Sequence, residues 1–148
     1  MRTWIAPSLT MLLLAACATA PVEVRREAAG SPEQVTERIA ARLTVLGFQV
    51  SDRSAAGLTA TSKSASPDWT GCPPRRVGDG DDRRIMVTAR TRLATVRVGL
   101  TPVDGRTAVE VRTEFEASYN NPMRAETFSG ACGSTGVIEA AVLEAAGS

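Results

Sequence analysis

The sequence predicts an α+β domain in which an N-terminal and a C-terminal helix pack on one face of an antiparallel sheet of about five strands. Three observations support this prediction. Apolar residues recur at helical spacing after Ser31, Asp104-Gly105 separates two alternating runs, and an apolar, alanine-rich run follows Gly136. Alternating strands need a cover on one face, which two amphipathic helices would supply. The expected element order is α-β-β-β-β-β-α.

The first residues of the chain are typical of an export signal. Met1-Arg2 precedes an apolar run from Trp4 to Leu14, which is shorter than the roughly 20 apolar residues of a membrane-spanning helix. The run ends in Leu14-Ala15-Ala16-Cys17, which resembles the lipobox of bacterial lipoproteins. The resemblance implies that residues 1–16 are a signal peptide and that Cys17, lipidated on its thiol, is the first mature residue. The alternative is an ordinary signal peptide that is cut nearby.

The residues after Cys17 indicate which membrane holds the protein and how far its domain can lie from the anchor. In the enterobacterial sorting system of this lipoprotein class, Ala18 favours the outer membrane, so we expect a lipid-anchored protein that faces the periplasm. Residues 17–30 lack sustained apolar periodicity and are expected to form a flexible tether with a root-mean-square span of roughly 20 Å. Residues 31–148 are then a single periplasmic α+β domain.

The first predicted helix begins at Ser31, with Pro32 at its first position and Gln34 completing a capping box. Its apolar stripe consists of Val35, Ile39, Leu43 and Leu46. Gly47 suits the end of the helix, and Phe48 is placed to pack back on Leu43. The charges on the other side are mixed, so we expect a core helix rather than a membrane-surface helix.

Two short strands are expected next, over residues 48–52 and 58–62, with a turn between them. The helix followed by this hairpin, over residues 33–62, resembles the helix–hairpin unit of small BamC-like envelope lipoproteins, which belong to the outer-membrane barrel-assembly machinery. The resemblance implies a scaffold or accessory role in the envelope. It does not extend to the cysteines further along the chain.

Residues 64–84 contain most of the prolines and glycines of the middle of the chain and are expected to form a surface loop that carries Trp69 and Cys72. Gly78 to Asp82 could offer oxygen atoms to calcium, but the run lacks the spacing and the distal Glu of an EF-hand, so no metal site is predicted. Residues 85–90 are the third expected strand.

The strongest tertiary prediction is a hairpin between residues 95–101 and 107–117, with Asp104-Gly105 as a type I′ turn. The predicted core-facing pairs are Leu100 with Val109, Val98 with Val111, Val96 with Thr113 and Ala94 with Phe115. A slip by one residue would mix apolar and charged side chains on both faces, so the pattern itself specifies the register.

The other face of this hairpin places Arg97 opposite Arg112. Like charges in that position repel, and Glu110 and Glu114 lie diagonally, where they can neutralise them. The first interpretation is therefore a solvated charged face. The second is a site for an anionic ligand, for which Arg97, Arg112 and Trp69 are the candidate residues.

After Tyr119 to Pro122 a second loop is expected to run to Cys132, followed by a final helix from Val137 with Ser134 or Thr135 as its cap. The apolar stripe of this helix would consist of Ile138, Ala141, Val142 and Ala145.

Cys72 and Cys132 are an even pair once Cys17 carries lipid, and an oxidising periplasm favours their pairing. The bridge would close a loop of 61 residues. Two separate buried thiols are the alternative.

Composition argues against several function classes. From Cys17 onward the chain has 16 basic and 16 acidic side chains and no His, so nothing suggests nucleic-acid binding, and the commonest general base and metal ligand is missing. We expect no catalytic residues and no cofactor.

The leading hypothesis is a non-catalytic envelope lipoprotein that binds an envelope protein or peptidoglycan. The alternative is a small-ligand-binding or inhibitory lipoprotein, with a groove between the two helices and the loop that carries Trp69.

Overall fold

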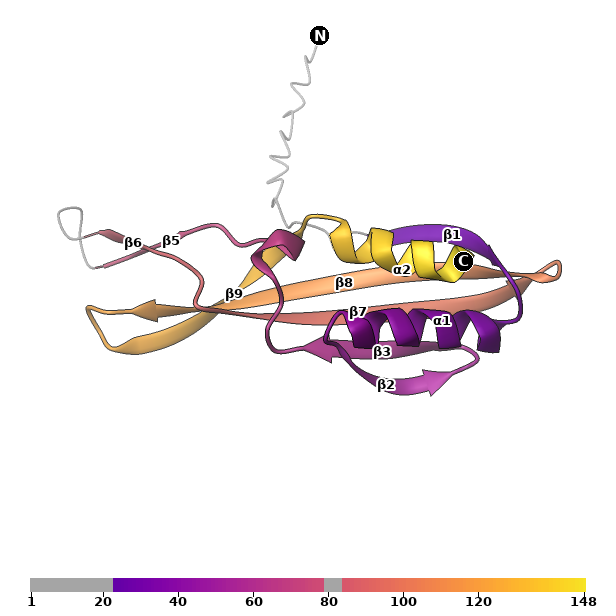
Figure 1. The fold of residues 1–148 in the computed structure, drawn as a ribbon. Coiled ribbons are helices and arrows are strands. Elements are labelled where there is room, and N and C mark those ends of the chain that lie inside the picture. The colour runs from indigo at the N-terminus through magenta and orange to yellow at the C-terminus, as the bar shows by residue number, and fades with distance from the viewer. Residues whose placement is uncertain (1–22, 79–83) are drawn as a thin grey trace, which may run out of the picture.

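An antiparallel sheet with two helices on one face organises residues 23–78 and 84–148, the parts of the chain that the computed structural model describes (Figure 1). Within these ranges seven strands form the main sheet: β1 Glu23–Ala29, β2 Gln49–Ser54, β3 Gly57–Ser62, β4 Thr70–Gly71, β7 Thr91–Val103, β8 Arg106–Asn121 and β9 Glu126–Ser134. The helices are α1 Pro32–Val45 and α2 Val137–Gly147. The α+β class is confirmed, and the expected five strands were too few.

The order of neighbouring strands is β2-β3-β7-β8-β9-β4, and β1 also pairs with β8. A separate two-stranded ribbon consists of β5 Arg75–Val77 and β6 Ile85–Val87. The strand expected over residues 85–90 therefore ends early and does not join the main sheet. A short 3₁₀ turn, η1 Pro67–Trp69, precedes β4.

The β7–β8 hairpin has the predicted register. Leu100 pairs with Val109 and Val98 with Val111, and the pairs continue on both faces as expected. Asp104 and Gly105 have φ angles of 46° and 76°, which are the positive values that a type I′ turn requires. This hairpin is the longest pairing in the sheet.

Two predictions were wrong because they overlooked the edge of β8 that does not pair with β7. β1 pairs with residues 106–112 of β8, and β9 pairs with residues 115–121, so the two strands lie end to end along one edge. Residues 23–29 are therefore a strand rather than part of the flexible tether, and residues 126–134 are a strand rather than a loop. The reason is that a 16-residue strand would otherwise leave a row of unpaired backbone groups along this edge.

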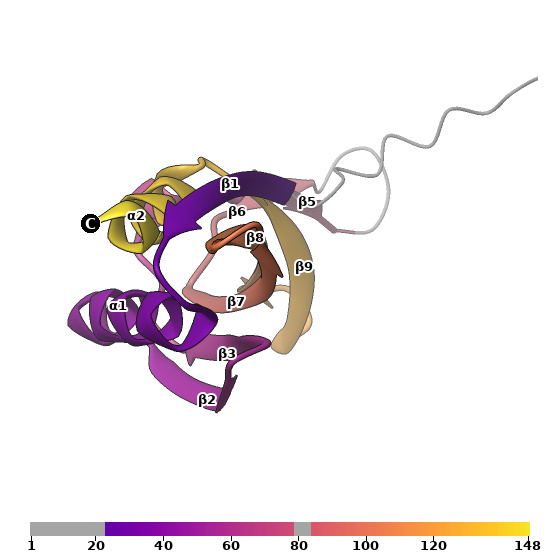
Figure 2. The ribbon, with the colours of Figure 1, turned by 90° about the vertical axis from the view of Figure 1, so that its right-hand side faces the viewer.

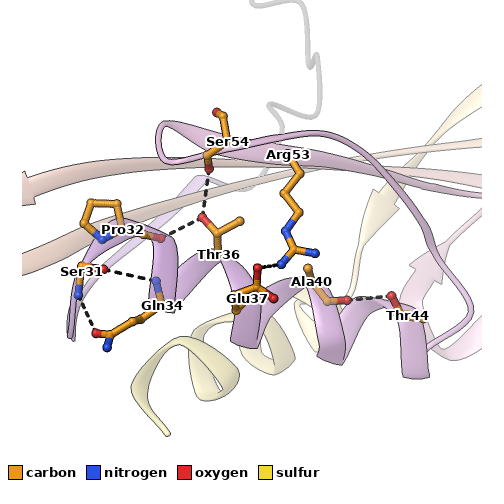
Figure 3. A network of polar contacts seen from close by, with 9 residues as sticks. All are labelled: Ser31, Pro32, Gln34, Thr36, Glu37, Ala40, Thr44, Arg53 and Ser54. Carbon is orange, nitrogen blue, oxygen red and sulfur yellow. Dashed lines mark hydrogen bonds and ion pairs between the residues drawn. The ribbon is translucent and has the colours of Figure 1, made fainter.

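The capping box of α1 is confirmed, because the Ser31 side chain accepts from the Gln34 backbone and the Gln34 side chain accepts from Ser31 (Figure 3). Hydrogen bonds from the helix backbone and from Ser31 hold the pKa of the Glu33 carboxyl below its ordinary value. At the other end Gly47 has φ 84°, and the Phe48 amide donates to the Leu43 carbonyl at 2.9 Å. Both ends of the helix are therefore determined locally by the sequence.

The Thr36 side chain ties α1 to the β2–β3 hairpin. Its hydroxyl oxygen lies 2.8 Å from the Pro32 carbonyl and 3.1 Å from the Ser54 carbonyl, and an ion pair between Glu37 and Arg53 lies beside it (Figure 3). These contacts join α1 to the end of β2.

The start of α2 differs from the prediction. Its N-cap is Gly136, with φ 84° and no side-chain cap, rather than Ser134 or Thr135. The expected stripe is only partly correct, since Ile138 and Val142 are buried but the third core position is Ala146. Ala141 and Ala145 are half-buried.

Both helices lie on the same face of the sheet, as predicted, and the core is between them and the strands (Figures 1 and 2). The fully buried core side chains include Val35, Ile39 and Leu43 from α1, Val96, Val109 and Val111 from the hairpin, and Ile138 and Val142 from α2. The opposite face of the sheet carries no helix in the described ranges, and we call it the open face.

Candidate functional site

The open face carries the two arginines that the sequence singled out. Arg97 and Arg112 lie directly opposite each other on β7 and β8. Nη1 of Arg97 lies 2.6 Å from Oε1 of Glu114, and Nη2 of Arg112 lies 3.3 Å from Oε1 of Glu110. These four side chains are between 42% and 56% exposed. The arrangement agrees with the first interpretation, in which glutamates neutralise the arginines on a solvated face.

The open face is also hollowed in two places. A hollow of about 520 Å³ lies over β7, β8 and β9 and is lined by Leu93, Thr95, Glu114, Phe115, Glu116, Ser129, Gly130 and Ala131. A second, of about 450 Å³, lies over the β2–β3 turn and the centre of the hairpin, and its polar lining includes Asp52, Ser54, Thr59, Arg97, Glu110 and Arg112. Arg97 lines one hollow and Glu114 the other, so their ion pair separates the two.

Two glycines, Gly57 and Gly99, pair directly across β3 and β7 in the second hollow. Gly57 has φ +144°, and a Cβ atom there would lie 1.9 Å from the Val98 carbonyl oxygen, so the turn cannot accept a side chain. Gly99 differs, since the nearest atom to a Cβ there is the Glu110 Cβ at 3.9 Å. The hollow is therefore open because residue 99 lacks a side chain, and not because packing requires a glycine.

Trp69 does not belong to this site, which corrects its place among the candidate ligand residues. Its ring stacks on Phe48 with centroids 5.6 Å apart, and it packs against the core on the helix side of the sheet. Its carbonyl accepts from the Thr135 amide at 3.1 Å. The alternation of the hairpin places the arginines on the open face, but no pattern in the sequence indicates on which side of the sheet Trp69 lies.

The expected groove between the two helices and the Trp69 loop can be compared with a hollow that the described residues form between the helices. A hollow of about 450 Å³ does lie between α1 and α2, and its lining consists of Arg38, Ala41, Arg42, Val45, Glu144, Ala145 and Ser148. Trp69 does not line it. The hollow is largely apolar, with charged side chains around it, and it is wide open to solvent.

Cys72 and Cys132 form a disulfide, with their Cα atoms 4.6 Å apart. This confirms the predicted pairing and excludes two separate thiols. The bridge attaches the segment between β4 and β5 to β9, beside the short β4–β9 ladder that pairs Thr70 with Ser134.

Sequence reasoning missed one buried carboxyl, that of Glu139. This side chain is 1% exposed, and one of its oxygens accepts a hydrogen bond from the Thr113 hydroxyl. Its other oxygen, Oε2, has no hydrogen-bond partner among the residues that the structure describes. A signal was present in the sequence, because Thr113 is the one polar residue among the predicted core-facing pairs of the hairpin and needs a polar partner.

Catalytic and metal-binding groups were not predicted, and residues 23–78 and 84–148 contain no group of three or more His, Cys, Asp or Glu side chains that could hold a metal ion. In the same ranges no helix has the length and apolar character needed to cross a membrane. The predicted signal peptide, the predicted lipid-attachment residue Cys17 and the run from Asp79 to Asp82 lie outside the described residues. Comparisons with protein-family models, curated proteins and solved structures return no match for this chain.

Proposed function

We propose that this protein is a lipid-anchored, non-catalytic lipoprotein of the bacterial cell envelope, held at the outer membrane and facing the periplasm. In this proposal it binds another envelope component in a scaffold or accessory role. The observation that carries the proposal is the lipobox ending at Cys17, which the Cys72–Cys132 disulfide supports. Structural disulfides are typical of oxidising compartments such as the periplasm, so two independent features favour export.

The open face is the surface that we propose for the partner. Its Arg97–Glu114 and Arg112–Glu110 pairs are half-exposed, so each charged group can exchange its present partner for one on a ligand at little cost. The face offers both donors and acceptors beside hollows of about 520 and 450 Å³. A peptide-like surface fits this pattern, because it presents amides, carboxylates and amines together. Envelope proteins and the stem peptides of peptidoglycan both have these groups.

The anchor is tested by a Cys17→Ser variant expressed from the native gene. The proposal predicts that wild-type protein sediments with outer membranes and that the variant is lost from them. Cys72→Ser is the matched control, because it removes a different cysteine and leaves the lipobox intact. A Cys17→Ser variant that remains in the outer-membrane fraction contradicts the proposal.

The open face is tested by Gly99→Thr, which fills the second hollow where a Cβ atom meets only the Glu110 Cβ at 3.9 Å. Val45→Thr is the matched control, since Val45 is 77% exposed on α1, away from the open face. In cells treated with a mild crosslinker, Gly99→Thr should reduce the yield of the wild-type crosslinked species at least fivefold, and Val45→Thr should leave it unchanged. Equal yields in both variants contradict the role of the open face.

A small-ligand-binding or inhibitory lipoprotein is the second candidate, and the hollow of about 520 Å³ favours it because its volume suits a small molecule. Trp69 lies on the opposite side of the sheet, so its fluorescence would not report on this hollow. Leu93 lines the hollow, so Leu93→Trp provides a local probe. A saturable change in its emission with one compound of a metabolite and muropeptide panel would favour this candidate over the scaffold role.

A further inference from the structure

One glutamate on the open face of β8 has no partner. β8 carries three glutamates on this face, and arginines neutralise two of them: Arg97 pairs with Glu114, and Arg112 pairs with Glu110. The third, Glu116, is exposed, and no ion pair or hydrogen bond reaches its side chain within the described ranges. The charge pairing of the hairpin therefore leaves one negative charge uncompensated.

This free carboxylate lies in the larger hollow of the open face, the one of about 520 Å³ that Glu114 also lines. The two glutamates are two positions apart on one strand, so their side chains leave the same face roughly 7 Å apart. Arg97 neutralises Glu114 from the side of the second hollow. The lining of the larger hollow includes no basic side chain. A cation that enters it is therefore attracted by Glu116 and meets no competing positive group.

The neighbours of Glu116 are apolar on two sides and carry hydroxyl groups further along. Leu93 on β7 and Ala131 on β9 both lie directly opposite Glu116 in the sheet, and Leu93 is 40% exposed. Thr95 and Ser129 line the same hollow, and in the part of the chain that the structure describes neither hydroxyl has a hydrogen-bond partner. The hollow thus combines a free carboxylate, two free hydroxyl groups and an apolar wall.

This combination matches a primary amine at the end of an aliphatic chain. A protonated amine has three N–H donors, and the Glu116 carboxylate and the two hydroxyl groups can accept them. The carbon atoms that precede the amine can pack on Leu93. A calcium ion fits less well, because it takes six to eight oxygen ligands and prefers several carboxylates.

The size of the hollow favours a short peptide over the face of a folded protein. Eight residues line it, whereas a stable protein–protein interface uses about 20–30 residues on each partner. Its volume of about 520 Å³ lies within the range of small-ligand pockets. Resting on the periplasmic location and the open face proposed above, we propose that this hollow binds the side-chain amine of a diamino acid in a peptidoglycan stem peptide. Glu116 is the residue that selects an amine over an uncharged group.

The test measures the binding of two synthetic stem tripeptides to the full chain in detergent by isothermal titration calorimetry. One tripeptide ends in a diamino acid with a free side-chain amine, and in the other this amine is acetylated. The free amine should bind wild-type protein at least threefold more tightly. Glu116→Gln keeps the shape of the side chain but removes its charge, so it should abolish this preference.

Glu144→Gln is the matched control. Glu144 is also an exposed carboxylate without an ion pair among the described residues, but it lies on α2, on the other side of the sheet. This variant should keep the wild-type preference for the free amine. Added salt should weaken the preference in wild-type protein and in Glu144→Gln, because a charge pair near the surface is screened.

Equal affinities of wild-type protein for the two tripeptides overturn the inference. Equal losses in Glu116→Gln and Glu144→Gln also overturn it, because they would report only the overall charge. A linear peptide with one lysine is a third probe, and tighter binding of this peptide that depends on Glu116 would assign the hollow to a protein partner instead. Crosslinking with Gly99→Thr separates the two proposals. If Gly99→Thr reduces the crosslink but Glu116→Gln keeps the amine preference, only this inference fails, whereas no effect of either variant refutes the open face as well.

Discussion

Removal of the Cys72–Cys132 bridge should destabilise the domain by a predictable amount. The two cysteines are 60 residues apart, and the chain-entropy model assigns a crosslink over such a loop about 4 kcal/mol. For a domain of this size, that loss lowers Tm by roughly 15 °C. Alanine is the substitution of choice, because Cys132 packs against the core and serine would place a hydroxyl there.

Cys72→Ala, Cys132→Ala and the double variant should lose the same free energy of unfolding to within about 1 kcal/mol, because each change removes the same bridge. Urea unfolding followed by circular dichroism measures all three, and wild-type protein with reductant provides a fourth measurement without mutation. Clearly unequal single losses, or a double variant that loses the sum of both, would refute this reasoning.

Three further changes test local features of the fold. Ser31→Ala removes the cap of α1 and should cost about 1 kcal/mol, measured by urea unfolding against an exposed control, Ser64→Ala, which should cost nothing; equal values would contradict the role of the cap. Gly105→Ala forces a side chain onto a residue with φ 76° and should cost about 1 kcal/mol, so an unchanged Tm would contradict the assigned turn. Thr113→Val leaves the Glu139 carboxyl buried without the hydrogen bond from Thr113 and should cost about 3 kcal/mol. Adding Glu139→Leu should restore most of the lost free energy of unfolding. A double-mutant cycle that shows no coupling between the two substitutions would contradict this reasoning.

The parts of the fold that the sequence predicted are those determined by local chemistry or by strict alternation. Ser31 and Gly47 mark the two ends of α1 through hydrogen bonds within a few residues. Asp104-Gly105 and the alternation around it specify the hairpin register, because any other register would place charged side chains in the core. The cysteine count predicted the bridge without any knowledge of geometry.

The parts that the sequence did not predict depend on partners far away in the chain. In β1 only Val24 and Ala28 face inward, and Arg26, which lies between them in the alternation, is exposed. β9 contains two glycines and several small polar residues. Neither segment therefore has the alternation of apolar residues that predicts a strand. Both strands form because they pair with the long edge of β8 that β7 does not occupy. The start of α2 at Gly136 was missed for a similar reason, since a glycine with positive φ replaces the usual side-chain cap.

For the candidate site, the sequence predicted the charges but not the shape. The pairing of Arg97 and Arg112 with neighbouring glutamates followed from the register. The two hollows depend on the curvature of the sheet and on the missing side chain at Gly99, neither of which periodicity describes. The helix-side position of Trp69 depends on its contact with Phe48, which is a tertiary feature.

The most direct test of the proposed lipid anchor is the intact mass of the protein extracted from outer membranes. We expect a chain that begins at Cys17 and carries acyl groups, with Cys72 and Cys132 oxidised to one bridge. A chain that begins at Met1 without acyl groups, with three free thiols and in the cytosol, would contradict both the anchor and the compartment.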